Sequence, residues 1–176
     1  MKLLVNFCGG PGSGKSALAA GVFARLKWSG VSCELVTEFA KDKVWEESIK
    51  LLDDQMYVFG EQLHRVNRLR GKVDVVLTDS PLINSIIYYA GDHRDSFFSL
   101  VREIEQTFKT LDVIVLRHGG AYEQAGRYQT EDEAAAIDKR ACEEIAALGR
   151  TPLKMKSCEE SALALCNTIT SELKQR

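Results

Sequence analysis

The residues whose types and spacing most clearly indicate a chemical role lie close together near the start of the chain, at positions 9–16. Gly9, Gly14, Lys15 and Ser16 occupy every fixed position of the pattern G-x-x-x-x-G-K-[ST]. Glycines let the backbone wrap closely around phosphate oxygens with its N–H groups pointing inward. In this pattern the lysine bridges the β- and γ-phosphates, and the serine hydroxyl is a ligand of Mg²⁺. The pattern therefore predicts a P-loop that binds ATP and Mg²⁺.

A strand should end just before this loop and a helix should begin within it, so that the helix N-terminus adds a favourable dipole for an anion. We assign nucleotide binding to the loop and the start of that helix, namely Gly10, Pro11, Gly12, Ser13, Gly14, Lys15, Ser16 and Ala17.

Asp79 ends a second apolar run, at residues 73–78. An acidic residue at the end of such a strand is typical of a Walker-B element, which lies beside the P-loop and holds the Mg²⁺ shell. We therefore expect Ser16 and Asp79 to hold the metal, and we include Asp79 among the catalytic candidates. The alternative is a polar residue that merely ends a strand, because Ser80-Pro81 can open a helix.

Glu38 and Asp42 follow another predicted strand, at residues 33–37. Ligands of open α/β sheets gather at the carboxyl ends of the strands, where a carboxylate can accept the proton of an acceptor hydroxyl or orient the acceptor. Glu38 is the first candidate for this role and Asp42 the reserve. Both could instead be solvated loop carboxylates, and Asp79 is a rival to Glu38 as the base.

The segment 118–129 contains three glycines, and Arg117 and Arg127 lie near its two ends. A mobile loop that carries arginines can close over a transferring phosphoryl group, exclude water and neutralise charge. We predict that this segment is a lid and that both arginines are catalytic. The alternative is a surface loop with incidental arginines.

We expect residues 38–70 and 80–95 to form the pocket for the acceptor, with Asp42, Gln62 and Arg65 as candidate contacts. The basic face of the predicted helix 53–70, which carries Arg65, could instead simply be solvated. Trp45, Tyr88 and Tyr89 could stack on a base, although packing in the core or at a rim would also account for them.

The elements that must position these residues alternate along the chain. Nearly continuous apolar runs, typical of buried parallel strands, lie at 3–8, 33–37, 73–78 and 111–116, with a weaker one at 153–156. Helical patterns lie between them at 15–28, 53–70, 83–110 with a break near Gly91, and from about 130 to 148, and a last helix follows residue 157. This alternation predicts a three-layer α/β/α domain.

The chain has 176 residues and a formal net charge of −2, which fits a single domain over residues 1–176 and gives no support to a strongly basic surface for DNA. Five cysteines without a C-x-x-C pair indicate reduced thiols. No apolar run is long enough to span a membrane. We expect a cytoplasmic protein with a small-molecule partner, and a homodimer through the helices at 53–70 and 94–110 is a reasonable hypothesis.

Taken together, these motifs resemble the small P-loop kinases of the nucleoside/nucleotide kinase group, and especially their phage and bacterial nicotinamide-riboside-kinase-like members. The resemblance rests on the P-loop, Thr37-Glu38-Phe39, Thr78-Asp79-Ser80-Pro81-Leu82, and the segment 126–134 with Ile137-Asp138 after it. It implies a five-stranded parallel sheet of order 2-3-1-4-5, an acceptor-directed role for Glu38, and lid arginines at Arg117 and Arg127. Nucleoside kinases have Glu-Arg-Ser where this chain has Asp79-Ser80-Pro81.

The function predicted from these residues is transfer of the γ-phosphoryl group of ATP to a nucleoside, a nucleotide or a modified nucleobase. One alternative is a phage-type kinase that acts on a hydroxyl within DNA. An alternative of another class is an ATP-hydrolysing switch or motor-associated ATPase.

Overall fold

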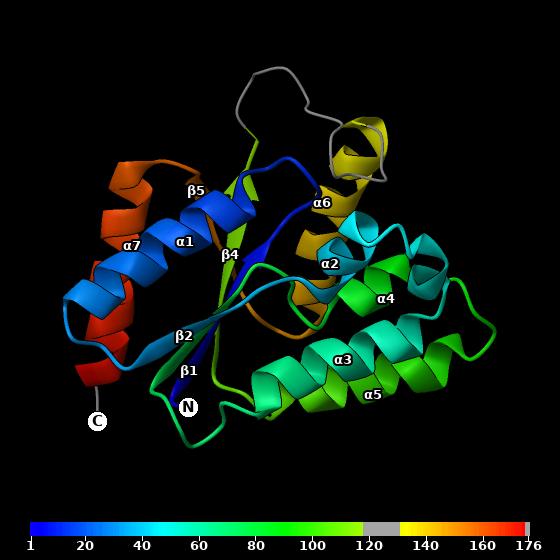
Figure 1. Cartoon of the computed structure of the whole chain (residues 1–176), viewed down its shortest axis with the longest axis horizontal. Helices are drawn as coiled ribbons and strands as arrows, with labels where there is room; N and C mark the ends of the chain where they lie inside the picture. Colours follow the sequence, from blue (N-terminus) through cyan, green and yellow to red (C-terminus); the bar gives the residue numbers. More distant parts are fainter. Residues whose placement is uncertain (118–130, 175–176) are drawn as a thin grey trace.

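The computed structural model describes residues 1–117 and 131–174, and its helices and strands alternate along the chain (Figure 1). In chain order the elements are β1 (Leu3–Cys8), α1 (Lys15–Trp28), β2 (Cys33–Val36), α2 (Phe39–Trp45), the 3₁₀ helix η1 (Ile49–Asp53), α3 (Gln55–Asn67), β3 (Val75–Thr78), α4 (Asn84–Tyr88), α5 (Arg94–Gln106), β4 (Thr110–Leu116), α6 (Glu131–Ala147), β5 (Leu153–Lys156) and α7 (Glu159–Lys174).

All five strands are parallel, and their order in the sheet is β2-β3-β1-β4-β5. β1 is the central strand. Its residue Leu4 is in register with Val76 on one side and with Thr110 on the other. The fold class and the strand order expected from the sequence and its resemblance are therefore confirmed.

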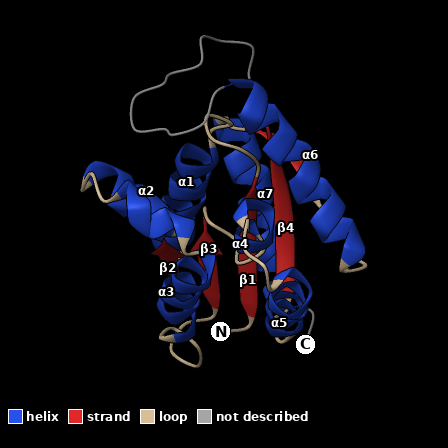
Figure 2. Cartoon of the chain, turned by 90° about the vertical axis from the view of Figure 1, so that its right-hand side faces the viewer, coloured by secondary structure: helices blue, strands red, loops and turns tan. Residues whose placement is uncertain are grey.

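The helices cover both faces of this sheet, which gives three layers (Figures 1 and 2). α1 and α7 pack together on one face, and α3, α4, α5 and α6 cover the other. No helix within residues 1–117 and 131–174 is both long enough and apolar enough to cross a membrane.

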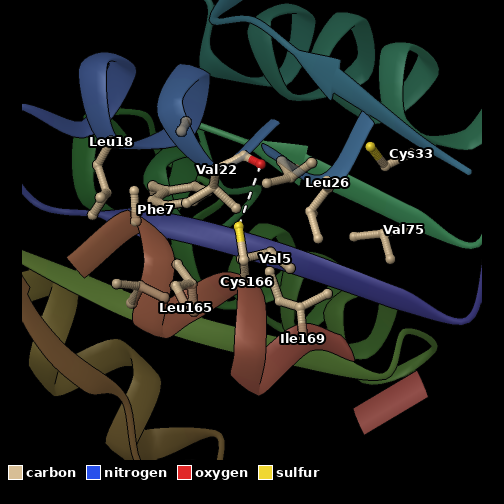
Figure 3. Close-up of a cluster of buried hydrophobic side chains, with 14 of the residues drawn as sticks. Val5, Phe7, Leu18, Val22, Leu26, Cys33, Val75, Leu165, Cys166 and Ile169 are labelled. Carbon is tan, nitrogen blue, oxygen red and sulfur yellow. Dashed lines mark hydrogen bonds between the residues drawn. The ribbon is translucent and has the colours of Figure 1, made fainter. Parts of the chain in front are cut away.

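The core between α1, α7 and the sheet holds the start of α1 in place (Figure 3). Phe7 of β1, Leu18 and Val22 of α1, and Leu165 of α7 are almost completely buried in it. The thiol of Cys166 donates a hydrogen bond to the Val22 carbonyl at 3.6 Å, so α7 is also tied to the backbone of α1. These contacts determine where the N-terminus of α1 points.

A buried polar cluster lies beneath the other face of β1 and β4. The guanidinium of Arg150 donates to Glu105 at 3.1 Å and to the Thr110 hydroxyl at 2.5 Å, and it lies 3.1 Å from Asp112. Asn6 donates to the second oxygen of Asp112 at 2.9 Å. Glu105 has no exposed surface, and burial raises its pKa to about 6. The cluster joins α5, the two strands and the link from α6 to β5.

Candidate active site

The loop between β1 and α1 has the backbone that its glycines predict. Gly14, the residue before α1, has φ +93°, a left-handed conformation that disfavours any side chain. A Cβ there would also lie 2.6 Å from the Cβ of Ser157. The Ser157 hydroxyl donates to the Gly14 carbonyl at 3.0 Å, so the segment after β5 supports the loop. The N–H groups that open α1 are thereby held where they can bind an anion.

A cavity of about 620 Å³ opens at the carboxyl ends of β1, β2 and β3. Lys15 and Ser16 of the P-loop line it together with Glu38, which belongs to a second motif. The loop and the start of α1 contribute Gly9, Pro11, Gly12, Gly14 and Ala17 to the same lining. Gly10 and Ser13, also predicted to bind nucleotide, do not line the cavity; Ser13 is buried beneath the loop.

Lys15 reaches back over the loop, and its Nζ donates to the Gly10 carbonyl at 2.9 Å. Burial lowers its pKa, and the nearby carboxylates of Glu38, Asp79 and Asp138 oppose that shift. A cation held among carboxylates keeps its charge more readily than burial alone would allow. Lys15 is therefore placed to act as a point charge against phosphate oxygens.

Ser16 lines the cavity and contacts Asp79, which is buried and does not itself line it. The Ser16 hydroxyl donates to Asp79 Oδ2 at 2.5 Å, while Asp79 Oδ1 is buried and has no hydrogen-bond partner among the described residues. A carboxylate oxygen without a donor beside a hydroxyl oxygen is a fitting pair of ligands for Mg²⁺. The described residues contain no group of three or more His, Cys, Asp or Glu side chains arranged for a metal ion. Phosphate oxygens and water would therefore have to complete the shell.

Glu38 is the residue before α2, in an extended conformation that carries the chain from β2 into the helix. Gln62 of α3 holds this junction, because its amide oxygen accepts from Phe39 N–H at 3.0 Å and its amide nitrogen donates to Thr78 at 3.3 Å. Burial raises the pKa of Glu38; Lys15 opposes this shift and Asp79 adds to it. A carboxylate with a raised pKa is better matched to accepting a proton near neutral pH.

Asp42 and Arg65, two of the substrate candidates, are paired with each other instead of lining the cavity. Their ion pair measures 2.7 Å, and the Arg65 guanidinium lies 5.2 Å from the centre of the Phe39 ring. These contacts join α2 to α3. Gln62, the third candidate, does line the cavity but also secures the Glu38 junction.

Arg117 lies just beyond β4 and does not line the cavity. It donates to Asp138 at 2.6 Å and to the Pro11 carbonyl at 2.8 Å. Arg127 and the predicted lid at 118–129 lie outside the described residues.

The rest of the cavity is a wall formed by α2, η1, the start of α3, and the segment from the end of β3 into α4. This wall lies within residues 38–70 and 80–95, where the acceptor pocket was expected from the sequence. Its apolar side chains are Val44, Trp45, Ile49, Leu52, Val58, Pro81 and Tyr88. Polar side chains of Gln55, Asn84 and Ser85 lie among them, and Lys41 and Asp53 add charge. Trp45 and Tyr88 are the two that the sequence also singled out as possible stacking partners. Helix α2 is too short to show a periodic pattern.

Comparison with known proteins agrees with this fold. A family model described as an AAA domain matches residues 4–160. The structure of deoxyadenosine kinase from M. mycoides with bound dATP aligns with 98% of this chain and 100% of its own, at 13% identity and a TM-score of 0.60, which indicates a common fold. APE1195 aligns at 19% identity over 96% of this chain and 95% of its own, and APS kinase from Mycobacterium tuberculosis aligns at 21% over 85% and 99%. Their TM-scores of 0.47 and 0.35 are too low to support an argument. A comparison with curated proteins found no match.

Proposed function

The chain belongs to the AAA domain family, and from this premise we propose that it is an ATP-dependent kinase that transfers a phosphoryl group to the hydroxyl of a small acceptor. One observation carries the proposal: Lys15, Ser16 and the carboxylate of Glu38 line the same cavity. A carboxylate in this position could activate water as well as an acceptor hydroxyl. The wall beside it, which can hold a second ligand, favours transfer to an acceptor over hydrolysis.

Each residue then has a defined task. The P-loop amides, the start of α1 and Lys15 bind the phosphates and stabilise charge on the transferring group. Ser16 and Asp79 would hold Mg²⁺, which neutralises charge on the β- and γ-phosphates when bound. The oxygen of the acceptor hydroxyl forms a bond to the γ-phosphorus, and the bond between the γ-phosphorus and ADP breaks. Glu38 accepts the proton that the acceptor hydroxyl loses in this step. The resemblance assigns Arg127 to the closing lid, and this role stays a prediction.

The charges around the acceptor wall favour an acceptor without a phosphate of its own. Glu38 and Asp53 face this part of the cavity, and Lys41 is the cation in its described lining besides Lys15. Arg65, the arginine that could have served an acceptor phosphate, is bound to Asp42. A dianion would therefore meet two carboxylates and one exposed lysine. A neutral molecule with a ring and a hydroxyl suits the aromatic and amide side chains of the wall.

The test is a screen with ATP labelled at the γ-phosphate. Purified protein is incubated with nucleosides, nucleoside monophosphates, oligonucleotides, or no acceptor, and the labelled product is identified. Label transferred to a free nucleoside or a comparable ring-bearing alcohol supports the proposal. Label in an oligonucleotide would instead support the DNA kinase, and stoichiometric release of phosphate without an acceptor would support the ATPase. Either result would contradict the function proposed here.

A further inference from the structure

The outer side of the P-loop is held by two charged residues from later in the chain. The N–H of Gly10 donates to Asp138 Oδ1 at 2.5 Å, and Arg117 Nε donates to Asp138 Oδ2 at 2.6 Å. A second nitrogen of Arg117 donates to the Pro11 carbonyl at 2.8 Å. The carboxylate and the guanidinium thus bind backbone groups of two consecutive loop residues, Gly10 and Pro11, and also bind each other.

Helix α6 packs closely against the loop at Gly10. A Cβ built on Gly10 would lie 2.2 Å from the Ala134 carbonyl oxygen and 2.7 Å from a nitrogen of Arg117. Ala134 and Asp138 are four residues apart, so one face of α6 supplies both contacts. Only glycine leaves room for this contact. The packing of α6 against the loop, and not a contact with a phosphate, therefore accounts for the glycine at position 10.

Arg117 and Asp138 contact the loop without lining the cavity. Gly9 and Pro11 of the loop do line it. About three quarters of each side chain is buried, since 23% of Arg117 and 26% of Asp138 is exposed. Charge-assisted hydrogen bonds of this kind hold their partners in one geometry. The positive charge of Arg117 also offsets the negative charge of Asp138, which would otherwise lie close behind a phosphate-binding loop.

We propose that Arg117 and Asp138 are positioning residues that hold the first arm of the P-loop, residues 9–11, in its phosphate-binding shape from outside the cavity. Arg117 acts through the loop and through Asp138, and it does not contact the transferred phosphoryl group. This inference rests on the proposed function only in that the loop binds a nucleotide. It departs from the lid role that the resemblance implies for Arg117.

The test is a double-mutant cycle on binding of ADP, which needs neither an acceptor nor a phosphoryl transfer. Arg117→Gln, Asp138→Asn and the double variant are compared with the wild type by calorimetry. Each single variant should weaken ADP binding by about tenfold, the effect of one lost charge-assisted hydrogen bond. The double variant should be little worse than either single one, because both changes break the same unit. At saturating ATP, turnover should fall much less than affinity.

Arg25→Gln is the matched control. It removes another arginine–carboxylate pair, between Arg25 of α1 and Glu159 of α7, at a distance from the loop. It should leave ADP affinity unchanged. Unfolding in urea, measured for the wild type and every variant, separates a loss of fold from a change in the loop. Arg117→Lys should recover part of the affinity that Arg117→Gln loses.

Three results would overturn the positioning role. The first is normal ADP affinity in Arg117→Gln with turnover lower by about 10³-fold or more, which is the behaviour of an arginine that contacts the transition state. The second is full additivity of the effects of the two single changes, and the third is the absence of any effect on ADP affinity in both single variants. A wild-type protein that binds no ADP would refute the proposed function itself, and this outcome is distinct from the other three.

Discussion

The hydroxyl of Ser16 and the carboxylate of Asp79 lie 2.5 Å apart, although 63 positions separate the two residues in the chain. Their contact joins the first turn of α1 to the end of β3. It leaves the other oxygen of Asp79 buried and without a donor among the described residues. A bound Mg²⁺ would give this oxygen a positively charged partner. We therefore expect Asp79 to determine how activity depends on the Mg²⁺ concentration.

Asp79→Asn should raise the Mg²⁺ concentration needed for half-maximal activity by about 10- to 100-fold, because a neutral amide binds Mg²⁺ less well than a carboxylate of the same size. The measurement is a Mg²⁺ titration of the initial rate at fixed ATP. Asp74→Asn is the control, since Asp74 lies just before the same strand and pairs with Lys2 at the surface. Identical titrations for wild type and Asp79→Asn would show that the metal is held elsewhere.

Lys15→Ala should reduce turnover by roughly 10²–10³-fold or more, because the site loses the charge that stabilises the transferring phosphoryl group. Initial rates at saturating ATP measure this effect, and circular dichroism checks the fold. Lys27→Ala, which removes an exposed lysine at the other end of α1, should behave like the wild type. Normal turnover in Lys15→Ala would disprove the kinase hypothesis.

Glu38→Gln should reduce turnover by about 10²–10⁴-fold if Glu38 is the general base. Burial raises the pKa of Glu38, and only the deprotonated form accepts a proton. The rate should therefore rise with pH, with its acid limb above the value of about 4.3 for an ordinary glutamate. A pH profile of kcat/KM measures this limb. The limb should vanish in Glu38→Gln and persist in Asp42→Asn; loss of the limb in Asp42→Asn alone would make Asp42 the base.

Two glycine-to-alanine changes should have opposite effects on stability. Gly10→Ala drives a methyl group against the Ala134 carbonyl at 2.2 Å and should lower the free energy of unfolding by about 1–3 kcal/mol. Gly60 lies within α3, on an exposed position with no atom near a new Cβ. Gly60→Ala should raise the free energy of unfolding by about 0.5–1 kcal/mol. Urea denaturation measures both, and a neutral Gly10→Ala would contradict the close packing of α6 on the loop.

Glu105 should make the protein less stable as the pH rises. Burial raises its pKa from 4.5 to about 6 in the folded chain; Arg150 opposes this and Asp112 adds to it. The folded state therefore holds this proton more tightly, and the stability it confers is complete below about pH 4.5 and is lost as the pH rises through about 6. The loss amounts to roughly 2 kcal/mol.

Glu105→Gln should remove this part of the pH dependence, since glutamine does not titrate. Urea denaturation between about pH 4.5 and pH 7.5 compares the slopes. Glu103→Gln, on the exposed side of the same helix, is the control and should keep the wild-type slope. If the free energy of unfolding had the same pH dependence in all three proteins, Glu105 would not be protonated in the folded state within this pH range.

The sequence predicted the fold well where the residues themselves hold the information. The apolar runs at 3–8 and 153–156 and the helix at 15–28 have the bounds observed in the structure. The expected break near Gly91 separates α4 from α5. The order of the strands came from the family resemblance, because buried parallel strands look alike and do not specify their neighbours.

The candidate site was predictable in part, for a similar reason. Lys15, Ser16 and Glu38 belong to local motifs, and the rule for carboxyl strand ends was enough to bring them together. The ion pair of Asp42 with Arg65 depends on how α2 docks on α3, which no local pattern records. Asp138 and Gly10 are 128 positions apart in the chain, so no local sequence pattern predicts their contact either.

The central place of β1 has a consequence for how the protein is made. This strand leaves the ribosome before its two neighbours in the sheet, β3 and β4, which start only at Val75 and Thr110. The six residues of β1 are all buried in the final structure, but they stay unpaired until the segments that contain β3 and β4 have been synthesised. Long-range parallel pairing of this kind is slow, and until it forms the strand exposes apolar side chains and unpaired backbone groups that favour aggregation. Yield during expression should therefore depend on temperature and on chaperones that bind nascent chains.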